Sequence, residues 1–252
     1  MSEKLVFDAP EIMIDRPTHY CPGCHHGVAH RLVGEVLTEM GLVDDTLCVG
    51  SIGCSVFIYN YLDVDAVEAP HGRAPAVATG LKRAHKDKFV FTYQGDGDLA
   101  SIGLAEIVHA ANRGEKISVV FVNNTVYGMT GGQMAPTTLE GQKTTTSPNG
   151  RSADEHGLAI RMSEIIGGLG GTAYCERVSL DSVKNIRRAK KALRKAFEMQ
   201  VNGTGFGFVE MLSACPTNWK MDPIAANTRI TEEMIPYFPL GVFKDVTKDG
   251  EE

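Results

Sequence analysis

The sequence predicts an α/β protein with a mostly parallel β-sheet and helices on both of its faces. Two observations lead to this prediction. Five short runs rich in Val, Phe and Tyr alternate with longer segments whose apolar residues recur at helical spacing. The short runs are apolar throughout and do not alternate, which indicates strands buried on both faces. A chain of 252 residues can form one such domain, so we expect residues 1–252 to be a single domain.

The first half of the chain supplies three of these strands and two helices. The helix Gly27–Met40 has apolar residues at positions 28, 29, 32, 33, 36 and 37, on one helical face. The strand Thr46–Gly50 follows it. The strand Phe89–Gln94 precedes the helix Ala100–Asn112, and the strand Ile117–Asn123 comes next.

The second half begins with an irregular segment. Residues 128–151 are rich in Gly, Thr and Pro, which predicts a long loop, and such loops in compact domains are commonly functional. The strands Gly171–Glu176 and Phe206–Leu212 flank the helix Ser182–Gln200. The chain beyond Cys215 holds four of the eleven prolines and predicts a tail that wraps over a surface.

Composition excludes two classes of function. The 25 basic and 31 acidic residues give a net charge of −6, which disfavours binding to nucleic acid. No apolar stretch reaches the roughly 18 residues of a membrane span. A secretory signal needs an uninterrupted apolar region, and acidic residues interrupt the N-terminal segment of this chain. We therefore expect a cytoplasmic protein.

Helix 182–200 carries a concentration of positive charge. Seven of its residues between Lys184 and Lys195 are basic, beside a stripe of apolar residues. Such a run is usually a solvated helix face. It could also be a docking surface for an acidic partner, and the sequence leaves both interpretations open.

A phosphate and metal motif follows the strand 89–94. Gly95-Asp96-Gly97-Asp98 comes directly after this strand, and Asn123-Asn124 closes the next one. Glycines leave backbone amides free to approach a phosphate, while carboxylate and amide oxygens are ligands that Mg²⁺ prefers. The carboxyl ends of neighbouring parallel strands meet at one edge of a sheet. The pattern therefore predicts a diphosphate held through Mg²⁺, although Gly-Asp-Gly alone also fits a capped turn.

The six cysteines fall into two groups. Cys48 and Cys175 lie within predicted strands, where cysteine is usually a core residue. The other four lie in loops, two of them in a C-x-x-C pair: Cys21, Cys24, Cys54 and Cys215. Four loop thiolates suit either structural zinc or a [4Fe–4S] cluster, and spacing does not decide between them.

Five motifs together resemble the thiamine diphosphate-binding beta subunit of 2-oxoacid:ferredoxin oxidoreductases. The resemblance runs from Tyr20 through Gly132 and resumes at Cys215-Pro216-Thr217. The motifs are Tyr20-Cys21-Pro22-Gly23-Cys24, Ile52-Gly53-Cys54-Ser55, His71-Gly72-Arg73, Gly95-Asp96-Gly97-Asp98 and Asn123 to Gln133. The resemblance implies the thiamine diphosphate-binding fold, with an N-terminal cluster-binding segment.

The resemblance also assigns roles to individual residues. It implies a [4Fe–4S] cluster on Cys21, Cys24, Cys54 and Cys215, and Mg²⁺ on Asp96, Asn124 and the carbonyl of Val126. His71 is the implied catalytic residue of the cofactor pocket. The residues implied to line thiamine diphosphate are Ile52, Gly53, Cys54, Ser55, His71, Gly97, Asp98, Gly128 and Met129. One departure is His25-His26, where the family often has Gly-His; the bulkier residue could tune the cluster.

The implied reaction is oxidative decarboxylation of a 2-oxoacid to an acyl-CoA, with electrons passing through the cluster to ferredoxin. The segment from Met129 to Thr138 looks closest to members that act on 2-oxoisovalerate or 2-oxoglutarate, and Lys143 or Arg151 could meet a second carboxylate. The chain has no convincing second α/β domain. We therefore expect the glutamate that activates the cofactor to come from an alpha subunit, in an assembly that also holds gamma and delta subunits.

Two alternatives remain at this stage. One is a non-redox thiamine diphosphate-dependent decarboxylase subunit with structural zinc. The other is an electron-transfer or assembly subunit that keeps the fold and has lost cofactor binding, which the intact Asp96 and Asn124 disfavour.

Overall fold

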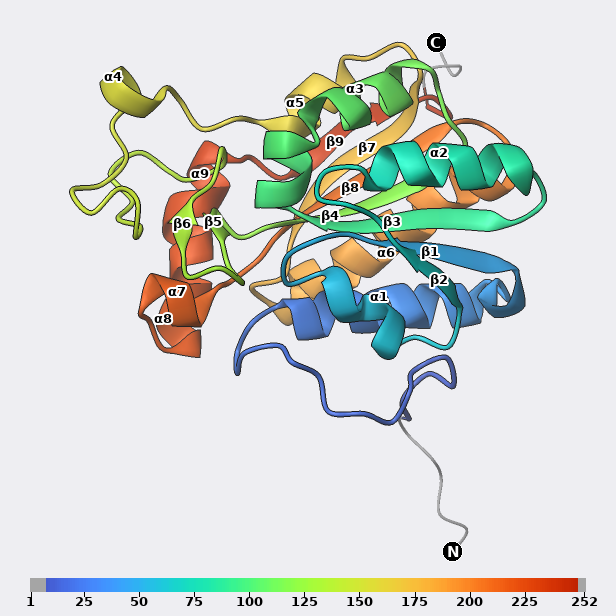
Figure 1. Cartoon of the computed structure of the whole chain (residues 1–252), viewed down its shortest axis with the longest axis horizontal. Helices are drawn as coiled ribbons and strands as arrows, with labels where there is room; N and C mark the ends of the chain where they lie inside the picture. The colour runs from blue at the N-terminus through green and yellow to red at the C-terminus, as the bar shows by residue number, and fades with distance from the viewer. Residues whose placement is uncertain (1–7, 249–252) are drawn as a thin grey trace, which may run out of the picture.

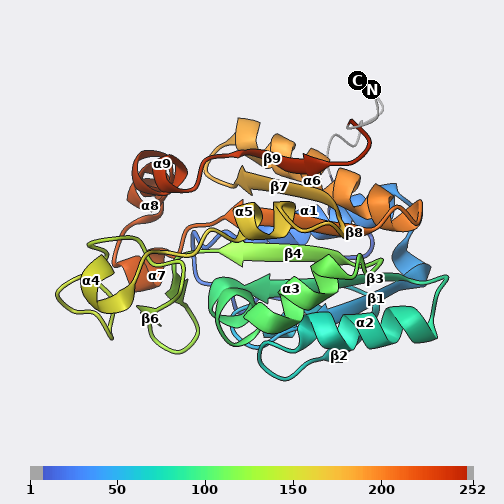
Figure 2. The same cartoon turned by 90° about the horizontal axis from the view of Figure 1, so that it is seen from above.

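The computed structural model describes residues 8–248, which form a seven-stranded sheet and a short hairpin. The strand order in the sheet is β2-β1-β3-β4-β8-β7-β9 (Figures 1 and 2). Only β9 is antiparallel to its neighbour among these described strands, so the mostly parallel sheet is confirmed. The strands are β1 (Thr46–Gly50), β2 (Asp65–Glu68), β3 (Phe89–Gly95), β4 (Ser118–Asn123), β7 (Thr172–Ser179), β8 (Phe206–Leu212) and β9 (Gly241–Asp245).

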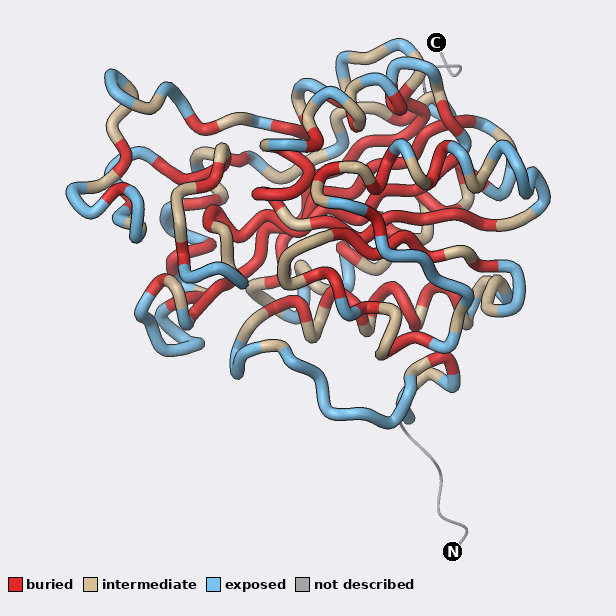
Figure 3. The backbone as a smooth tube through the Cα atoms, in the orientation of Figure 1, coloured by how far each residue is buried: buried red, intermediate tan, exposed pale blue. Residues whose placement is uncertain are grey.

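Helices cover both faces of the sheet, as predicted. In Figure 1, α1 (His26–Glu39) and α6 (Val183–Val201) lie below the sheet. The helices α2 (Ala74–Ala84), α3 (Leu104–Asn112) and α5 (Met162–Gly167) lie above it. Figure 3 shows the central strands buried between these two layers.

Aromatic side chains fill the core on each face. On the α1 and α6 face, the ring of Phe197 packs between Phe89 and Phe91, with centroids 4.7 and 6.3 Å away. On the opposite face Phe121 packs against Phe208 at 5.7 Å. Because apolar rings are buried on both faces of the sheet, the strand sequences are continuously apolar.

The structure contains regular elements that periodicity did not predict. The edge strand β2 is exposed along its whole length and therefore has no apolar run. Helix α3 begins at Leu104, later than expected, because Asp98–Ile102 form a π-helical turn. The short 3-10 turns are η1 (Val43–Asp45) and η2 (Val56–Asn60).

The irregular segments are also more ordered than the sequence suggested. Within the predicted loop lies the hairpin of β5 (Val126–Tyr127) and β6 (Gln133–Met134), and α4 (Ala153–His156) follows it. The tail folds into short helices before adding β9 to the edge of the sheet. These helices are α7 (Pro216–Trp219), α8 (Pro223–Arg229), the π-turn η4 (Ile230–Met234) and α9 (Ile235–Tyr237).

Much of the positive charge on α6 is paired within the protein. Lys190 pairs with Glu35 and Glu39 on α1, and Arg188 pairs with Glu176 on β7. Four basic residues, including the paired Arg188, line a surface hollow of about 380 Å³: Lys184, Arg187, Arg188 and Lys191. The helix is therefore partly a solvated face and partly an anchor for α1. Between residues 8 and 248, no helix has the length and apolar character of a membrane span.

The packing predicts how two substitutions on α6 will differ. Phe197→Ala removes a fully buried ring from the cluster with Phe89 and Phe91, and we expect it to lower the free energy of unfolding by about 3–5 kcal/mol. Val183→Ala on the same helix alters a side chain that is 66% exposed, so its effect should stay within about 0.5 kcal/mol. Urea unfolding followed by circular dichroism measures both; equal losses would contradict this account of the core.

Candidate functional site

The predicted cofactor residues meet at the carboxyl ends of β1, β3 and β4. They line a cavity of about 110 Å³, to which the loops after these strands and the hairpin β5–β6 contribute. The predicted residues that line the cavity are Ile52, Gly53, Cys54, His71, Asp96, Gly97, Asp98, Asn124, Val126, Gly128 and Met129. Gly95, from the predicted phosphate motif, lines it too, while His26, Tyr127 and Thr130 are lining residues to which the sequence assigned no cofactor contact.

Asp96 is the buried acid of this cavity, with 2% of its surface exposed. Its carboxylate accepts hydrogen bonds from the backbone N–H of Gly97 at 2.8 Å and the hydroxyl of Thr137 at 2.6 Å. Burial nevertheless raises the pKa of Asp96 to about 6, because these bonds compensate only partly for the lost water. Thr137 comes from the loop 128–151, and no spacing in the sequence pointed to it.

The other two predicted Mg²⁺ ligands lie beside Asp96. Thr125 separates Asn124 from Val126 and has φ +63°, a conformation that lets both neighbours face the cavity. Asn124 Oδ1 accepts a hydrogen bond from the N–H of Val126 at 3.3 Å, and the indole of Trp219 donates to the Asn124 carbonyl at 3.1 Å.

This donor set fits a divalent cation. Among residues 8–248 no ion pair involves Asp96, so its carboxylate is buried without a cationic side chain. Oxygen atoms of a carboxylate, an amide and a backbone carbonyl are the hard donors that Mg²⁺ accepts. Glycine at position 97 allows the ring of Tyr127 to pack against the backbone, since a Cβ there would lie 2.3 Å from this ring.

His71 is held by Asp98 at the mouth of the cavity. Its Nδ1 lies 2.5 Å from Asp98 Oδ1, which leaves Nε2 for another partner. Asp98 is fully buried and also accepts from Gly72 N–H, Ser51 and Gln94, so its carboxylate orients His71 and is not free for a ligand. The loop packs closely against the segment before α3: Gly72 has φ +77°, and a Cβ there would lie 2.6 Å from the backbone nitrogen of Gly103.

Two sequence expectations do not match the geometry. Ser55 does not line the cavity; it is buried and its hydroxyl donates to the Ser51 carbonyl at the start of η2. Arg151 does not face a substrate. Its guanidinium is buried and donates to backbone carbonyls on both sides, three in the loop 128–151 and three at or just after the end of α4: Ala135, Pro136, Thr138, His156, Gly157 and Leu158. Lys143 lies outside the cavity lining.

All four loop cysteines line the same second cavity, which has a volume of about 390 Å³. They come from the segment before α1 (Cys21 and Cys24), the loop after β1 (Cys54) and the loop after β8 (Cys215). Burial, together with the neighbouring thiols, raises the pKa of Cys24 and of Cys54 to about 12. The other two cysteines, Cys48 and Cys175, are fully buried in β1 and β7, as predicted.

The two cavities share part of their wall. Cys54, Asn124, Gly128 and Met129 line both of them. Any group bound to the cysteines would therefore lie next to a ligand in the first cavity.

The arrangement of the thiols bears on the kind of group they could bind. Within residues 8–248 no three His, Cys, Asp or Glu side chains converge as ligands of one metal ion. A four-iron cluster takes one thiolate on each iron, so its ligands surround a space and do not meet at a point. The four thiols around one cavity fit that requirement.

The two neighbouring histidines, His25 and His26, lie in different environments. His26 is fully buried and its Nδ1 lies 2.8 Å from the hydroxyl of Tyr93; burial lowers the pKa of His26 to about 3, so the ring is neutral. His25 accepts a hydrogen bond from the N–H of Ala214 at 3.1 Å. It thereby joins the segment of Cys24 to the loop of Cys215.

Comparisons with known proteins agree with this geometry. A profile described as "Thiamine pyrophosphate enzyme, C-terminal TPP binding domain" matches residues 51–211. A 2-oxoglutarate synthase subunit KorB of Methanocaldococcus jannaschii is 36% identical over 81% of this chain and 72% of its own length. A 2-oxoglutarate:ferredoxin oxidoreductase from Magnetococcus marinus has a similar fold, with a TM-score of 0.76, 24% identity, and coverage of 95% of this chain and 85% of its own.

The chain is more similar in sequence to part of a longer protein than to this KorB subunit. The ketoisovalerate oxidoreductase subunit VorA of Methanothermobacter thermautotrophicus is 51% identical over 93% of this chain. The match covers 49% of that subunit, so the chain spans about half the length of the VorA relatives.

The burial of Asp96 predicts a pH-dependent effect of Asp96→Asn in protein freed of Mg²⁺. Since burial raises the pKa of Asp96 from 3.8 to about 6, the native state binds the proton more tightly than the unfolded state. The ionised carboxylate therefore lowers stability above about pH 6 and costs nothing below about pH 4.

We expect the free energy of unfolding of the variant, relative to the parent, to improve by up to about 3 kcal/mol from about pH 4 to about pH 8. Urea titrations at several pH values with a chelator measure this difference. A difference that stays constant with pH would show that Asp96 is not a strained buried anion.

Proposed function

The chain belongs to the beta-subunit family of 2-oxoacid:ferredoxin oxidoreductases, and we propose that it takes part in oxidative decarboxylation of a 2-oxoacid to an acyl-CoA. The family membership confirms the resemblance seen in the sequence. One observation above all supports the proposed activity: a cavity lined by four thiols shares a wall with the cavity of a thiamine pyrophosphate-binding domain.

The first cavity would hold the cofactor by its diphosphate. Asp96, Asn124 and the carbonyl of Val126 would bind Mg²⁺, and the glycines after β3 would let the diphosphate approach the backbone. Thiamine diphosphate supplies an electron sink for decarboxylation of a 2-oxoacid. His71, fixed by Asp98 and half-exposed at 36% of its side chain, could orient groups at the mouth of the cavity through Nε2.

The second cavity would hold a [4Fe–4S] cluster on Cys21, Cys24, Cys54 and Cys215. Cys54 is the key residue because it lines both cavities. A short path from the cofactor favours transfer of electrons to the cluster, and from there to ferredoxin. Since thiols persist in reducing compartments, the proposal keeps the expected location in the cytoplasm.

A partner subunit is expected to complete the active site. The first cavity, at about 110 Å³, is smaller than the roughly 300 Å³ or more of typical cofactor sites. Among the described residues that line it there is no glutamate. We propose that an alpha subunit covers the remainder of the cofactor and supplies this glutamate, within an assembly that also contains gamma and delta subunits.

A branched-chain 2-oxoacid is the favoured substrate. The ketoisovalerate oxidoreductase subunit is 51% identical to this chain, against 36% for the 2-oxoglutarate synthase subunit. Arg151 could have bound the second carboxylate of 2-oxoglutarate, but its guanidinium is buried and donates to backbone carbonyls instead. 2-Oxoglutarate remains the second candidate, because several relatives carry that name.

The cluster proposal predicts a contrast among cysteines. Cys24→Ala removes a proposed ligand and should abolish stoichiometric iron, acid-labile sulfide and visible absorption in anaerobically purified protein. Cys175→Ala removes a thiol of the same chemistry that is buried in β7, so it should keep the full iron content. Stoichiometric zinc with no sulfide in the parent would instead support the non-redox decarboxylase subunit.

The catalytic proposal predicts activity only in the assembled complex. The co-purified complex, given coenzyme A and ferredoxin or viologen, should reduce the acceptor fastest with 2-oxoisovalerate in a panel of 2-oxoacids. The chain alone should show no turnover, because its site lacks the activating glutamate. Full activity of the isolated chain would overturn the partner proposal, and preference for 2-oxoglutarate would overturn the substrate.

A further inference from the structure

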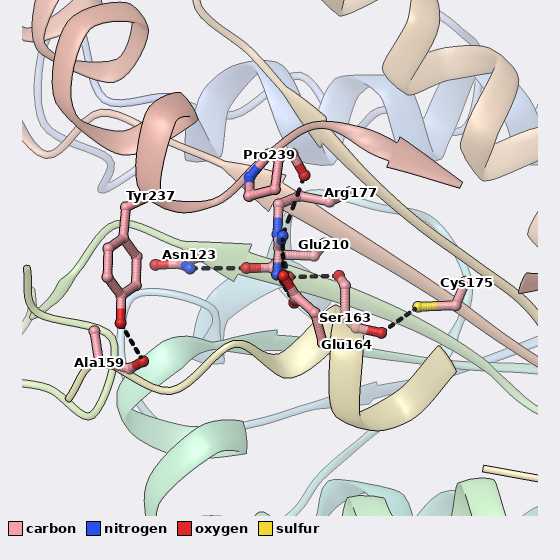
Figure 4. A network of polar contacts seen from close by, with 9 residues as sticks. All are labelled: Asn123, Ala159, Ser163, Glu164, Cys175, Arg177, Glu210, Tyr237 and Pro239. Atoms are coloured by element: carbon pink, nitrogen blue, oxygen red, sulfur yellow. Dashed lines mark hydrogen bonds and ion pairs between the residues drawn. The ribbon is translucent and has the colours of Figure 1, made fainter. Parts of the chain in front are cut away.

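We propose that Asn123 is a positioning residue for the metal-binding turn 124–126, and that Glu210 and Arg177 hold it from inside the sheet (Figure 4). This inference rests on the proposed function, since it concerns the turn that would bind Mg²⁺. None of the three residues lines the cofactor cavity, so each would act through the turn.

Asn123 joins the end of β4 to the turn that follows. Its Nδ2 donates to Glu210 Oε1 at 2.8 Å, and its Oδ1 accepts from the backbone N–H of Thr125 at 3.2 Å. The orientation of the amide is determined, because an ionised carboxylate only accepts and a backbone N–H only donates. One fully buried side chain thus connects β8 to the middle of the turn.

The residue that Asn123 holds has an unfavourable backbone conformation. Thr125 has φ +63°, which is costly for a β-branched residue and persists only where surrounding contacts impose it. Thr138 and Gln142 bind its carbonyl from the other side. Because Thr125 lies between the two ligands Asn124 and Val126, its conformation determines whether both face the metal.

Arg177 and Glu210 give Asn123 a fixed partner. Both side chains are fully buried, and Arg177 Nε donates to Glu210 Oε2 at 2.8 Å. Ser163 donates to the same oxygen at 2.5 Å, which leaves Oε1 for Asn123. A carboxylate buried this deeply needs a paired cation, so Arg177 allows Glu210 to remain a strong acceptor.

Arg177 also connects this network to the C-terminal tail. Its Nη1 donates to the carbonyl of Pro239 at 3.2 Å, and its guanidinium lies 5.3 Å from the centroid of the Phe238 ring. Figure 4 shows the bonds from Glu210 and from the carbonyl of Pro239 meeting at Arg177. The tail is thereby in contact with the residues that position the turn.

The test measures metal binding by the co-purified complex, because the partner subunit is proposed to complete the cofactor site. Mn²⁺ is the probe, thiamine diphosphate is present, and electron paramagnetic resonance of free Mn²⁺ is the signal. Asn123→Ala should weaken Mn²⁺ binding by about tenfold or more. Ser118→Ala is the matched control: Ser118 opens the same strand, is fully buried and donates to Gln200 at 2.8 Å. It should change the affinity by less than about twofold.

A rescue variant separates positioning from a general loss of stability. Glycine adopts φ +63° without help, so adding Thr125→Gly to Asn123→Ala should restore most of the lost affinity. If Asn123→Ala does not fold, Asn123→Ser replaces it with the same expectation. No Mn²⁺ binding by the complex that holds the parent chain would count against the proposed function. Binding by the parent that Asn123→Ala leaves unchanged, or a loss that Thr125→Gly does not restore, would overturn this inference alone.

Discussion

The parallel sheet is the constraint on which the site depends. Because β1, β3, β4 and β8 run in the same direction, the loops that follow them leave from one edge. That edge brings together residues as far apart in the chain as Cys54, Asp96 and Asn124, and it also brings Cys215 beside them. The glycines there let backbone and ligand approach closely, while the apolar strands keep the edge rigid.

Burial then determines the charge state of the groups that meet there. In protein without bound metal, the carboxyl of Asp96 and the thiols of Cys24 and Cys54 all have raised pKa values, so their protonated forms are favoured. Cations would reverse this preference. At neutral pH the metal-free protein therefore keeps its protons on the thiols of Cys24 and Cys54, whereas Asp96 is mostly ionised, and a metal bound to the thiols would displace their protons.

The sequence predicted the central strands and the two long helices well, because apolar periodicity records burial directly. It missed β2, whose exposed residues carry no such pattern, and β9, whose place beside β7 depends on distant packing. Motif spacing located Asp96 and Asn124. It could not find Thr137, which reaches Asp96 from another loop, and it misjudged Arg151, whose partners are backbone carbonyls that no composition reveals.

The backbone contact between Gly72 and Gly103 restricts how this chain can vary over evolutionary time. Each residue occupies the space that a side chain on the other would need, since a Cβ on Gly103 would lie 2.8 Å from the carbonyl oxygen of Gly72. Neither position can gain even a methyl group without moving the segment that carries His71. A substitution at Gly103, just before α3, would therefore require a change in the loop that holds Gly72 and His71. Functional relatives should keep both glycines.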